Sequence, residues 1–280
     1  MREELLDLLC CPLCRGELEL QAEATAGQEV MSGSLVCLGC GRTYPVEDGI
    51  PDLLPEEVVR GRDERWMRAY DRMAKSYYTL MHMLIPALSL WTEPLARSRW
   101  VSLLGLRRGD VVLDVATGAG RNLSFLLKRV GREGLVLGMD ISKSMLSLAA
   151  RQARARGWRN VELQRANASY LPYKDEVFDA VFHVGGVNTF EEKARALAEM
   201  VRVARPGARL VVVDEGLEPG KRQTFRGRFL LRMNALYASL PPLAELPEGV
   251  EEVRVRWGVV PCWPLPMWPF YVLAFRKAVK

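Results

Sequence analysis

Residues 111–120 read VVLDVATGAG, and this stretch predicts the fold of the chain. A short β-branched run ends in an acid, Asp114, and passes into a turn with two glycines before a helix expected at residues 122–130. In a parallel sheet, ligands bind beyond the carboxyl end of such a strand. Gly118 and Gly120 would let the backbone approach a ligand with no Cβ in the way. The stretch therefore predicts an α/β protein with a cofactor site at a strand end.

A second strand is expected at residues 135–140, and it ends in Asp140, 20 residues beyond Gly120. This position suits a carboxylate that accepts hydrogen bonds from ribose hydroxyls. The same spacing would also fit a nicotinamide dinucleotide. Ala116, however, stands where dinucleotide-binding loops most often have their first glycine, which argues against a strict dinucleotide site.

The residues that follow this second acid decide between the two cofactors. Residues 140–146 read DISKSML, and Asp-hydrophobic-Ser-x-x-Met-Leu resembles class I S-adenosylmethionine (SAM)-dependent methyltransferases. Ser142 is expected to cap the helix that begins there. The resemblance implies SAM as the cofactor, with Ile141 on the adenine face, Met145 among the cofactor residues and Asp114 able to pair with the methionine ammonium.

Three further stretches resemble the same class. Residues 166–173, ANASYLPY, and residues 178–181, FDAV, are similar to the family pattern Asp-Ala-x-x-Leu-Pro-Phe followed by Phe-Asp-Ala-Val. In the family the first acid accepts a hydrogen bond from the adenine amine. Here Asn167 stands in its place, and its amide carbonyl can still accept. Residues 198–213 resemble the helix, the Lys-Pro-Gly turn and the fifth strand of the family.

These stretches cover residues 110–215 and imply a Rossmann-like, seven-stranded class I methyltransferase sheet of the α/β class. His183 ends the fourth strand, on the side that faces the reacting methyl group in the family. It is either a general base or a residue that only lines the cofactor pocket. The residues expected to bind SAM are Tyr77, Asp114, Ala116, Gly118, Gly120, Asp140, Ile141, Met145, Asn167, Ala168 and His183.

The segment before this core is expected to form a linker and a lid. Residues 55–65 are charged and predict a linker, and residues 66–104 are mostly helical in pattern. Residues 70–78 resemble the stretch that precedes the core in relatives of the ubiquinone/menaquinone C-methyltransferases. There an aromatic-Asp pair begins a helix and a tyrosine seven residues on covers the cofactor, which Tyr77 matches. The apolar stretch at residues 80–91 is too short for a membrane span and predicts a core or lid helix.

Two CxxC knuckles, Cys11/Cys14 and Cys37/Cys40, lie near the N-terminus with twenty-two residues between them. Two such knuckles can close a tetrahedral four-sulfur site, which suits Zn²⁺ and leaves no open position for a catalytic water. A metal also stabilises a segment that is too short to bury much apolar area. Cys10 is adjacent to Cys11, but only Cys11 completes the knuckle spacing.

Residues 42–54, RTYPVEDGIPDLL, extend a resemblance over about residues 4–54 to the zinc-ribbon family that includes the activating subunit of tRNA methyltransferases. We therefore expect a zinc ribbon at residues 1–58, a linker and lid helices at residues 59–104, and the SAM-binding domain at residues 105–280. The N-terminus has acids where a signal peptide needs basic residues, so we expect a cytoplasmic protein. In that compartment paired cysteines indicate metal rather than disulfides.

Charge is unevenly distributed along the chain. The net charge of +5 divides into −8 over residues 1–60 and +13 over the remainder. An acidic ribbon is a poor docking surface for nucleic acid, whereas the basic remainder suits an anionic substrate, RNA or an anionic membrane surface. Basic residues at 221–232 alternate with apolar ones, which predicts either a solvated helix face or a mouth for an anionic or membrane-embedded acceptor. Residues 263–268 predict an apolar loop that flanks the acceptor or covers the sheet edge.

These patterns predict a SAM-dependent methyltransferase with a structural zinc, acting on a small or lipophilic acceptor, with peripheral membrane contact left open. Catalysis would come chiefly from positioning the acceptor for in-line displacement. An RNA base methyltransferase of the ribosomal-RNA guanine type is a second hypothesis, but its zinc ribbon would need a basic face. A non-enzymatic SAM-binding regulatory protein is a third, and it would need a closed acceptor pocket. The oligomeric state does not follow from the sequence.

Overall fold

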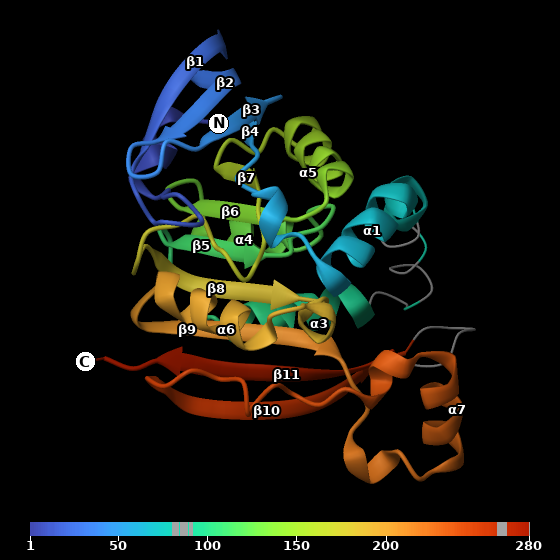
Figure 1. The fold of residues 1–280 in the computed structure, drawn as a ribbon. Helices are drawn as coiled ribbons and strands as arrows, with labels where there is room; N and C mark the ends of the chain where they lie inside the picture. The colour runs from blue at the N-terminus through green and yellow to red at the C-terminus, as the bar shows by residue number, and fades with distance from the viewer. Residues whose placement is uncertain (80–83, 85–88, 90–91, 262–267, 280) are drawn as a thin grey trace.

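The computed structural model describes residues 1–79, 84, 89, 92–261 and 268–279. Within these residues the chain forms a four-stranded antiparallel sheet near the N-terminus and a seven-stranded central sheet (Figure 1). The apolar stretch predicted at residues 80–91 and the loop predicted at residues 263–268 fall almost entirely outside the described residues. In the described part of the chain, none of the helices has the length and apolar character needed to cross a bilayer.

The central sheet confirms the predicted seven-stranded methyltransferase fold. From one edge to the other its strands are β10 (Val250–Val260), β11 (Trp268–Lys277), β9 (Ala204–Glu215), β8 (Phe178–Val184), β5 (Val111–Val115), β6 (Leu135–Asp140) and β7 (Val161–Arg165). Strands β7, β6, β5, β8 and β9 run parallel, and β11 pairs antiparallel with β9 and with β10. The strand order reverses at β5, because β6 lies on one side of it and β8 on the other. Ligands bind at such a switch point.

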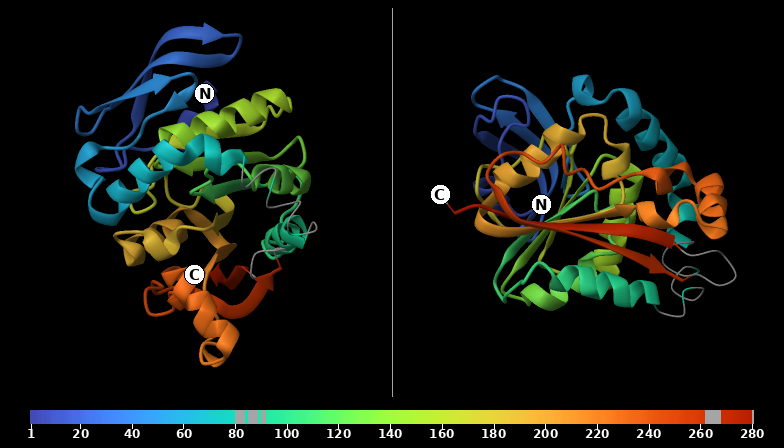
Figure 2. Two further views of the ribbon diagram at one scale, coloured as in Figure 1. Left: turned by 90° about the vertical axis from the view of Figure 1, so that its right-hand side faces the viewer. Right: turned by 90° about the horizontal axis from the view of Figure 1, so that it is seen from below.

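Helices cover both faces of the central sheet (Figure 2). One face packs against α3 (Thr92–Ser102), α4 (Leu123–Val130) and α5 (Lys143–Ala155), and the other packs against α6 (Lys193–Val203). Successive side chains of a strand point to opposite faces. Val112 accordingly joins the cluster of α3, α4 and α5, whereas Leu113 and Val115 join the cluster of α6. Both faces of β5 are therefore buried, as expected for a parallel sheet.

Helix α5 begins where the sequence predicts it. Ser142 Oγ accepts a hydrogen bond from the Met145 N–H at 3.2 Å, which caps the first turn. Helix α1 (Gly61–Thr79) differs from the prediction, because it begins inside the charged segment that was expected to be a linker. Its first turn contains Asp63 and Glu64, and acids are favourable there because they face the positive end of the helix dipole. Asp71 lies within this helix and does not begin one.

The N-terminal sheet is a meander of β1 (Leu18–Ala26), β2 (Glu29–Cys37), β3 (Thr43–Glu47) and β4 (Ile50–Pro51). Two short 3-10 helices flank it, η1 (Glu3–Asp7) and η2 (Glu56–Val58). The face that it turns to the rest of the protein is apolar. Together these elements form the predicted ribbon, which lies beyond β7 in Figure 1.

The ribbon docks on the central sheet through backbone and ionic contacts. The Leu53 N–H donates to the Arg165 carbonyl at the end of β7 at 2.8 Å, and the Cys10 N–H donates to the Pro172 carbonyl at 3.0 Å. The Asp52 carboxylate lies 2.7 Å from the Arg165 guanidinium. Ion pairs of both directions join the two parts, because Glu47 pairs with Lys143 while Arg2 of the ribbon pairs with Glu162.

The ribbon and the central sheet share one hydrophobic core. Leu9, Leu35 and Leu53 of the ribbon belong to the same buried cluster as Leu137 of β6 and Tyr173. None of these side chains is exposed to solvent. The ribbon therefore fills space on the α6 side of the sheet that a helix would otherwise cover.

Candidate cofactor site and cysteine cluster

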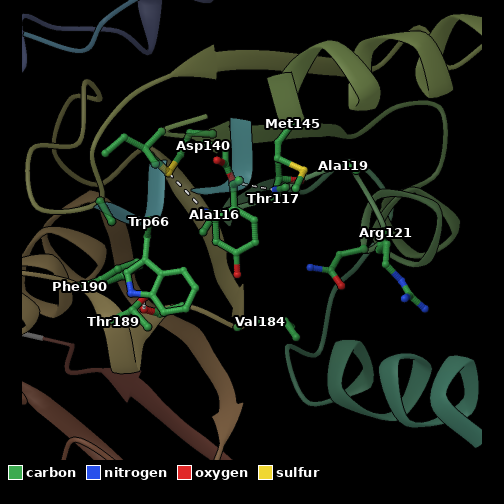
Figure 3. Close-up of a pocket in the computed structure, with 18 of the residues that line it drawn as sticks. Trp66, Ala116, Thr117, Ala119, Arg121, Asp140, Met145, Val184, Thr189 and Phe190 are labelled. Carbon is green, nitrogen blue, oxygen red and sulfur yellow. Dashed lines mark hydrogen bonds between the residues drawn. The ribbon is translucent and has the colours of Figure 1, made fainter. Parts of the chain in front are cut away.

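A cavity lies beyond the carboxyl ends of β5, β6, β7 and β8, at the place that the sequence predicts (Figure 3). It encloses about 1320 Å³, part of which is open to solvent. It is lined by these residues of the predicted set: Ala116, Gly118, Asp140, Ile141, Met145, Asn167 and Ala168.

The loop after β5 uses its small residues for two different purposes. Gly118 has φ of 56° and open space where a Cβ would stand, so its backbone is accessible from the cavity. A Cβ on Gly120 would instead lie 2.9 Å from Leu123 Cδ1 and 3.2 Å from Ala149 Cβ. Gly120 does not line the cavity, and its small size serves the packing of α4 and α5. Ala116 adopts φ of 54°, a left-handed conformation that costs an L-residue about 1–2 kcal/mol.

Asp140 is held in place by two backbone amides. Its Oδ2 accepts from the Gly118 N–H at 2.8 Å, and its Oδ1 accepts from the Ser142 N–H at 2.9 Å. A carboxylate has about four lone-pair sites, so both oxygens keep capacity to accept from a ligand. Burial raises the pKa of Asp140 to about 6. The side chain is thus a pre-oriented acceptor at the end of β6.

Asp114 does not line the cavity, so the structure does not support the expected contact with the methionine ammonium. Its Oδ2 accepts from Thr117 Oγ1 at 2.6 Å, and its Oδ1 accepts from Asn122 Nδ2 at 3.1 Å. The side chain is fully buried, and burial raises its pKa to about 6. Asp114 therefore connects the end of β5 to the turn and to the start of α4.

At the end of β7, Asn167 lies beside an acid that sequence reasoning missed. Asn167 Oδ1 accepts from the Ser169 N–H at 2.8 Å. Its Nδ2 donates to the Val58 carbonyl at 3.2 Å and to Asp63 Oδ2 at 3.0 Å. Both side chains line the cavity. Burial raises the pKa of Asp63 above its ordinary value. Asp63 belongs to α1, a helix far from Asn167 in the sequence, so no local motif indicates this pair.

Helix α1 forms one wall of the cavity. Asp63, Trp66 and Tyr70 all line it, and their i, i+3, i+7 spacing puts them on one face of the helix. The rings of Trp66 and Tyr70 lie 5.8 Å apart between centroids. Farther along, Asp71 Oδ1 accepts from Ser142 Oγ at 2.6 Å, which ties α1 to the start of α5. The side chain of Tyr77, predicted to cover the cofactor, lies outside the described residues.

Two arginines line the cavity near the loop after β5. Arg97 of α3 and Arg121 both pair with Glu93, which is completely buried. Arg97 also donates to Asn122 Oδ1. Burial raises the pKa of the Asp114 carboxyl and the Arg97 charge acts on it in the lowering direction, so two guanidinium groups lie near two carboxylates here. Figure 3 shows Arg121 across the cavity from Trp66. Sequence reasoning missed both arginines, because Arg97 comes from a helix that precedes the cofactor motifs.

His183 does not line the cavity, and its predicted role as a base needs correction. It is completely buried, its Nδ1 lies 2.8 Å from the Val115 carbonyl, and its Nε2 accepts from the Val187 N–H at 2.9 Å. Nδ1 therefore carries the proton that the carbonyl accepts. Burial lowers the pKa of His183, so the ring is neutral. Both ring nitrogens are hydrogen-bonded inside the protein, so His183 joins β5 and η4 (Val187–Thr189), and this arrangement does not support the predicted role as a base.

Glu215, at the end of β9, is an acid of the cavity wall that the sequence did not indicate. Its neighbour Asp214 is buried, and Asp214 Oδ2 accepts from the Asn188 N–H at 2.7 Å and from the Gly186 N–H at 3.2 Å. Burial and the adjacent Asp214 charge raise the pKa of Glu215 to about 9. Glu215 therefore keeps its proton to a higher pH than an ordinary carboxyl group, and in its protonated form it can donate a hydrogen bond.

The rest of the wall near Glu215 is mainly apolar. Val184 at the end of β8, Phe190, Leu236 and Trp268 line this part of the cavity. Leu236 belongs to η6 (Ala235–Ala238), which follows α7 (Phe225–Met233) and the short η5 (Pro219–Lys221). Leu236 is the residue of the segment 216–250, between β9 and β10, that lines the cavity.

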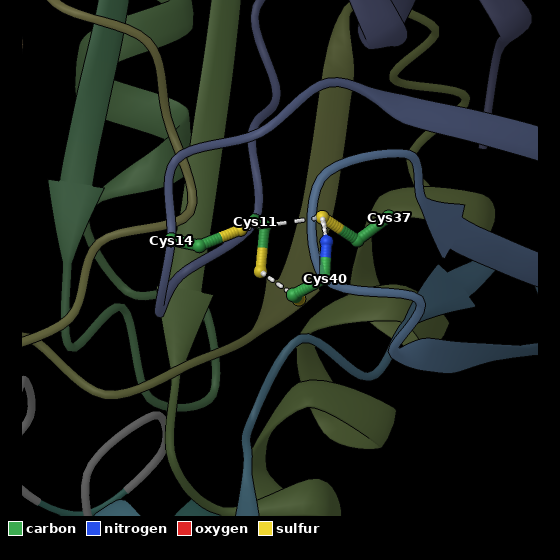
Figure 4. A group of neighbouring side chains, drawn as sticks. All are labelled: Cys11, Cys14, Cys37 and Cys40. Atoms are coloured by element: carbon green, nitrogen blue, oxygen red, sulfur yellow. Dashed lines mark hydrogen bonds between the residues drawn. The ribbon is translucent and has the colours of Figure 1, made fainter.

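The four cysteines of the CxxC knuckles converge in the ribbon (Figure 4). Their sulfur atoms all lie within 4.8 Å of one another, with 3.8 Å between Cys11 and Cys40 and 3.4 Å between Cys14 and Cys37. Zn–S bonds of about 2.3 Å in a tetrahedron put the sulfurs about 3.8 Å apart. The spacing far exceeds a disulfide bond of about 2.05 Å. The cluster therefore fits a four-coordinate metal, and Cys10 is not part of it.

Known proteins similar to this chain include two quinone-pathway enzymes. The ubiquinone/menaquinone biosynthesis C-methyltransferase UbiE of Francisella philomiragia is 36% identical over 138 residues, which are 49% of this chain and 54% of that protein. The demethylmenaquinone methyltransferase of Listeria welshimeri is 31% identical over 176 residues, 62% of this chain and 70% of that protein. The chain spans about half the length of the Francisella protein.

Among the solved structures similar to this chain is one chain of the complex between the Trm112 methyltransferase activator of Haloferax volcanii and a putative methyltransferase. It superposes with a TM-score of 0.54 at 16% identity, over 76% of this chain and 98% of the matched one, and so supports the fold. Residues 2–49 match the model of Trm112p-like proteins. Residues 59–224, more than half of the sequence, match the model of the ubiE/COQ5 methyltransferase family, and the chain belongs to that family.

Proposed function

We propose that this protein binds SAM in the cavity and transfers its methyl group to a lipophilic acceptor of the quinone class in its reduced form. The observation that carries the proposal is the pre-oriented Asp140 carboxylate, fixed by Gly118 and Ser142 at a strand end beside an open glycine loop. Membership of the ubiE/COQ5 family supports the reaction type. The names of the Francisella and Listeria relatives support the acceptor class.

The cofactor would lie across three successive strand ends. In this proposal Asp140 accepts from the ribose hydroxyls, as the acid after the second strand does in nucleotide-binding sheets. The guanidinium groups of Arg97 and Arg121, which line the cavity, suit the methionine carboxylate, because charge-assisted hydrogen bonds to guanidinium groups are strong. Gly118 lets the methionine part approach the backbone. SAM supplies a methyl group that its sulfonium makes electrophilic.

The acceptor would occupy the apolar part of the cavity. Phe190, Leu236 and Trp268 can hold a ring by burial of apolar surface. Glu215, whose pKa is raised by burial and by the adjacent Asp214 charge, can in its protonated form donate a hydrogen bond to a ring oxygen and so orient the acceptor. Placing the reacting atom in line with the methyl group removes translational and rotational entropy from the barrier. These residues position the acceptor, and no protein base is required of His183.

The cysteine cluster would hold one structural zinc. Four thiolates complete the coordination sphere, so the ion has no open position and takes no part in methyl transfer. The fit of the sulfur spacing to a tetrahedron supports this assignment. Because the ribbon shares its core with the central sheet, the ion would stabilise the cavity-bearing part as well.

Helix α7 would bring the protein to an anionic membrane surface. Phe225, Phe229 and Met233 are 82%, 51% and 52% exposed, and their i, i+4, i+8 spacing puts them on one side of the helix. Residues 219–244 contain five basic residues and no acid. Amphipathic basic helices of this kind bind anionic bilayers. The neighbouring η6 lines the cavity through Leu236, so membrane contact would place a lipid-dissolved acceptor near the site.

The test of the reaction is transfer of a labelled methyl group from SAM to a short-chain demethylnaphthoquinol under reducing conditions, with total RNA in a parallel reaction. Label in the quinol and none in RNA is expected. Label in RNA alone would overturn the quinone-class acceptor in favour of the RNA hypothesis. Label in neither substrate, with SAM bound, would favour the regulatory hypothesis.

The membrane contact has a test of its own. Vesicles with phosphatidylglycerol should sediment the protein, and phosphatidylcholine vesicles should not. Arg226→Glu/Arg228→Glu should abolish binding. The matched double reversal Arg129→Glu/Arg132→Glu changes exposed residues in the last turn of α4 and just after it, and should keep binding. Equal loss in both double variants would show that only net charge matters and would refute α7 as the contact.

A further inference from the structure

We propose that Asp63, in the first turn of α1, accepts the hydrogen bond of the exocyclic amino group of the cofactor's adenine. The proposal rests on the SAM site proposed above and names the residue that selects its base. It makes a helix outside the central sheet part of the cofactor site.

The position of the base follows from the strand order. The glycine loop follows β5, Asp140 ends β6, and Asn167 comes shortly after β7. Adjacent strands lie about 4.8 Å apart. A ligand that lies across these strand ends therefore has successive parts of its length at β5, β6 and β7. With the methionine at the loop and the ribose at Asp140, the base lies at the end of β7. Asn167 and Asp63 are the polar side chains that line this end.

The amide of Asn167 is not oriented to receive an amino group. Its Nδ2 has two acceptors, the Val58 carbonyl at 3.2 Å and Asp63 Oδ2 at 3.0 Å, and its Oδ1 has one donor, the Ser169 N–H at 2.8 Å. Turning the amide over would place its oxygen against a carbonyl and a carboxylate. The three partners therefore fix Nδ2 on the side of Asp63, and a purine amino group there would meet a donor.

The Asp63 carboxylate keeps the acceptor capacity that an amino group needs. Oδ1 accepts from the Glu191 N–H at 3.0 Å, and Oδ2 accepts from Asn167 Nδ2. Two further lone-pair sites remain on the two oxygens. These two bonds also fix the rotamer, so the carboxylate is already in place before a ligand enters.

Trp66 and Tyr70 strengthen the case, because they share the cavity-facing side of α1 with Asp63. Aromatic rings stack on purine faces. Helix α1 would thus provide two contacts to the base. Asp63 would accept a hydrogen bond from its edge, and the rings of Trp66 and Tyr70 would stack on its face. Such an edge contact separates 6-amino from 6-oxo purines, since a 6-oxo group has no proton to donate and would face a carboxylate.

The experiment measures binding of S-adenosylhomocysteine and S-inosylhomocysteine by calorimetry. The unmutated protein should prefer the adenosyl ligand at least roughly tenfold, in line with one charge-assisted hydrogen bond. Asp63→Asn should weaken the adenosyl ligand roughly 10- to 100-fold and leave the inosyl ligand unchanged or tighter, because an amide can donate to a 6-oxo group. The swap Asp63→Asn/Asn167→Asp should restore the preference, since it returns one carboxylate to the pair.

Glu64→Gln is the matched control. Glu64 is the next residue of the first turn of α1, but its carboxylate pairs with Arg68 and it does not line the cavity, so its loss should leave both affinities unchanged. Equal weakening in Glu64→Gln would show that the start of the helix matters rather than the base contact, and would overturn the proposal. So would an unchanged ligand preference in folded Asp63→Asn. If the unmutated protein bound neither ligand, the SAM site itself would be refuted.

Discussion

The shared core predicts that a cavity in the ribbon destabilises the methyltransferase part. Leu9 lies in the ribbon, is fully buried, and belongs to the same cluster as Leu137 of β6. Leu→Ala at such sites costs about 2–5 kcal/mol, and we expect about 3 kcal/mol for Leu9→Ala. For a chain of this size that corresponds to a lower Tm by roughly 6–12 °C.

The natural fluorescence of the chain makes this prediction specific. All seven tryptophans lie at or after Trp66, outside the ribbon, so their emission reports only the methyltransferase part. In Leu9→Ala the fluorescence transition and the release of metal from the cysteines should move together to lower temperature. Leu38→Ala, the same change at a ribbon residue that is 62% exposed, should move neither by more than about 2 °C. An unshifted fluorescence transition in Leu9→Ala would refute the shared core and would show that the ribbon unfolds alone.

Three further predictions concern the site and the metal. Asp140 should bind the ribose hydroxyls in its ionised form, so ligand binding should lower its pKa. That pKa is about 6 without ligand. The Kd of S-adenosylhomocysteine should therefore rise as the pH falls below 6, by up to about tenfold per pH unit. Asp140→Asn should bind roughly 10- to 100-fold more weakly at pH 7 and lose this dependence, and a parallel pH profile in calorimetry would contradict the assignment. At Ala116, where φ is 54°, glycine should be as stable as alanine or up to about 1 kcal/mol more stable, and valine less stable; urea denaturation in which valine equals glycine would exclude the strain. Freshly purified protein should contain one equivalent of zinc and Cys14→Ser should lose it, so elemental analysis finding far less zinc in the unmutated protein would remove the zinc assignment.

The parts of the site that come from one strand and its following turn were predictable from sequence. Gly118 follows the end of β5 and Asp140 ends β6. These two strands pair in parallel, so their ends lie side by side regardless of which helices pack on the sheet. Ser142 caps α5 through a contact three residues away. The two CxxC knuckles are local as well, and their spacing alone indicated a four-sulfur cluster. In each case the chemistry resides in a short segment whose backbone geometry is set by its own residues.

Contacts between distant segments were decided only by the tertiary structure. Asp63 and Arg97 reach the cavity because α1 and α3 pack over it, and no spacing in the sequence records that packing. His183 sits at the predicted strand end, yet alternation along β8 and the carbonyl of Val115 turn its ring into the protein. The sequence of the ribbon alone matches a family model. The core that it shares with the central sheet, however, forms only when apolar side chains of the ribbon pack against apolar side chains of the sheet. The chemistry of a short motif is set by residues that are neighbours in the chain. Which side chains are buried, and which hydrogen-bond partners they have, is decided when apolar surfaces from distant segments pack together and exclude water.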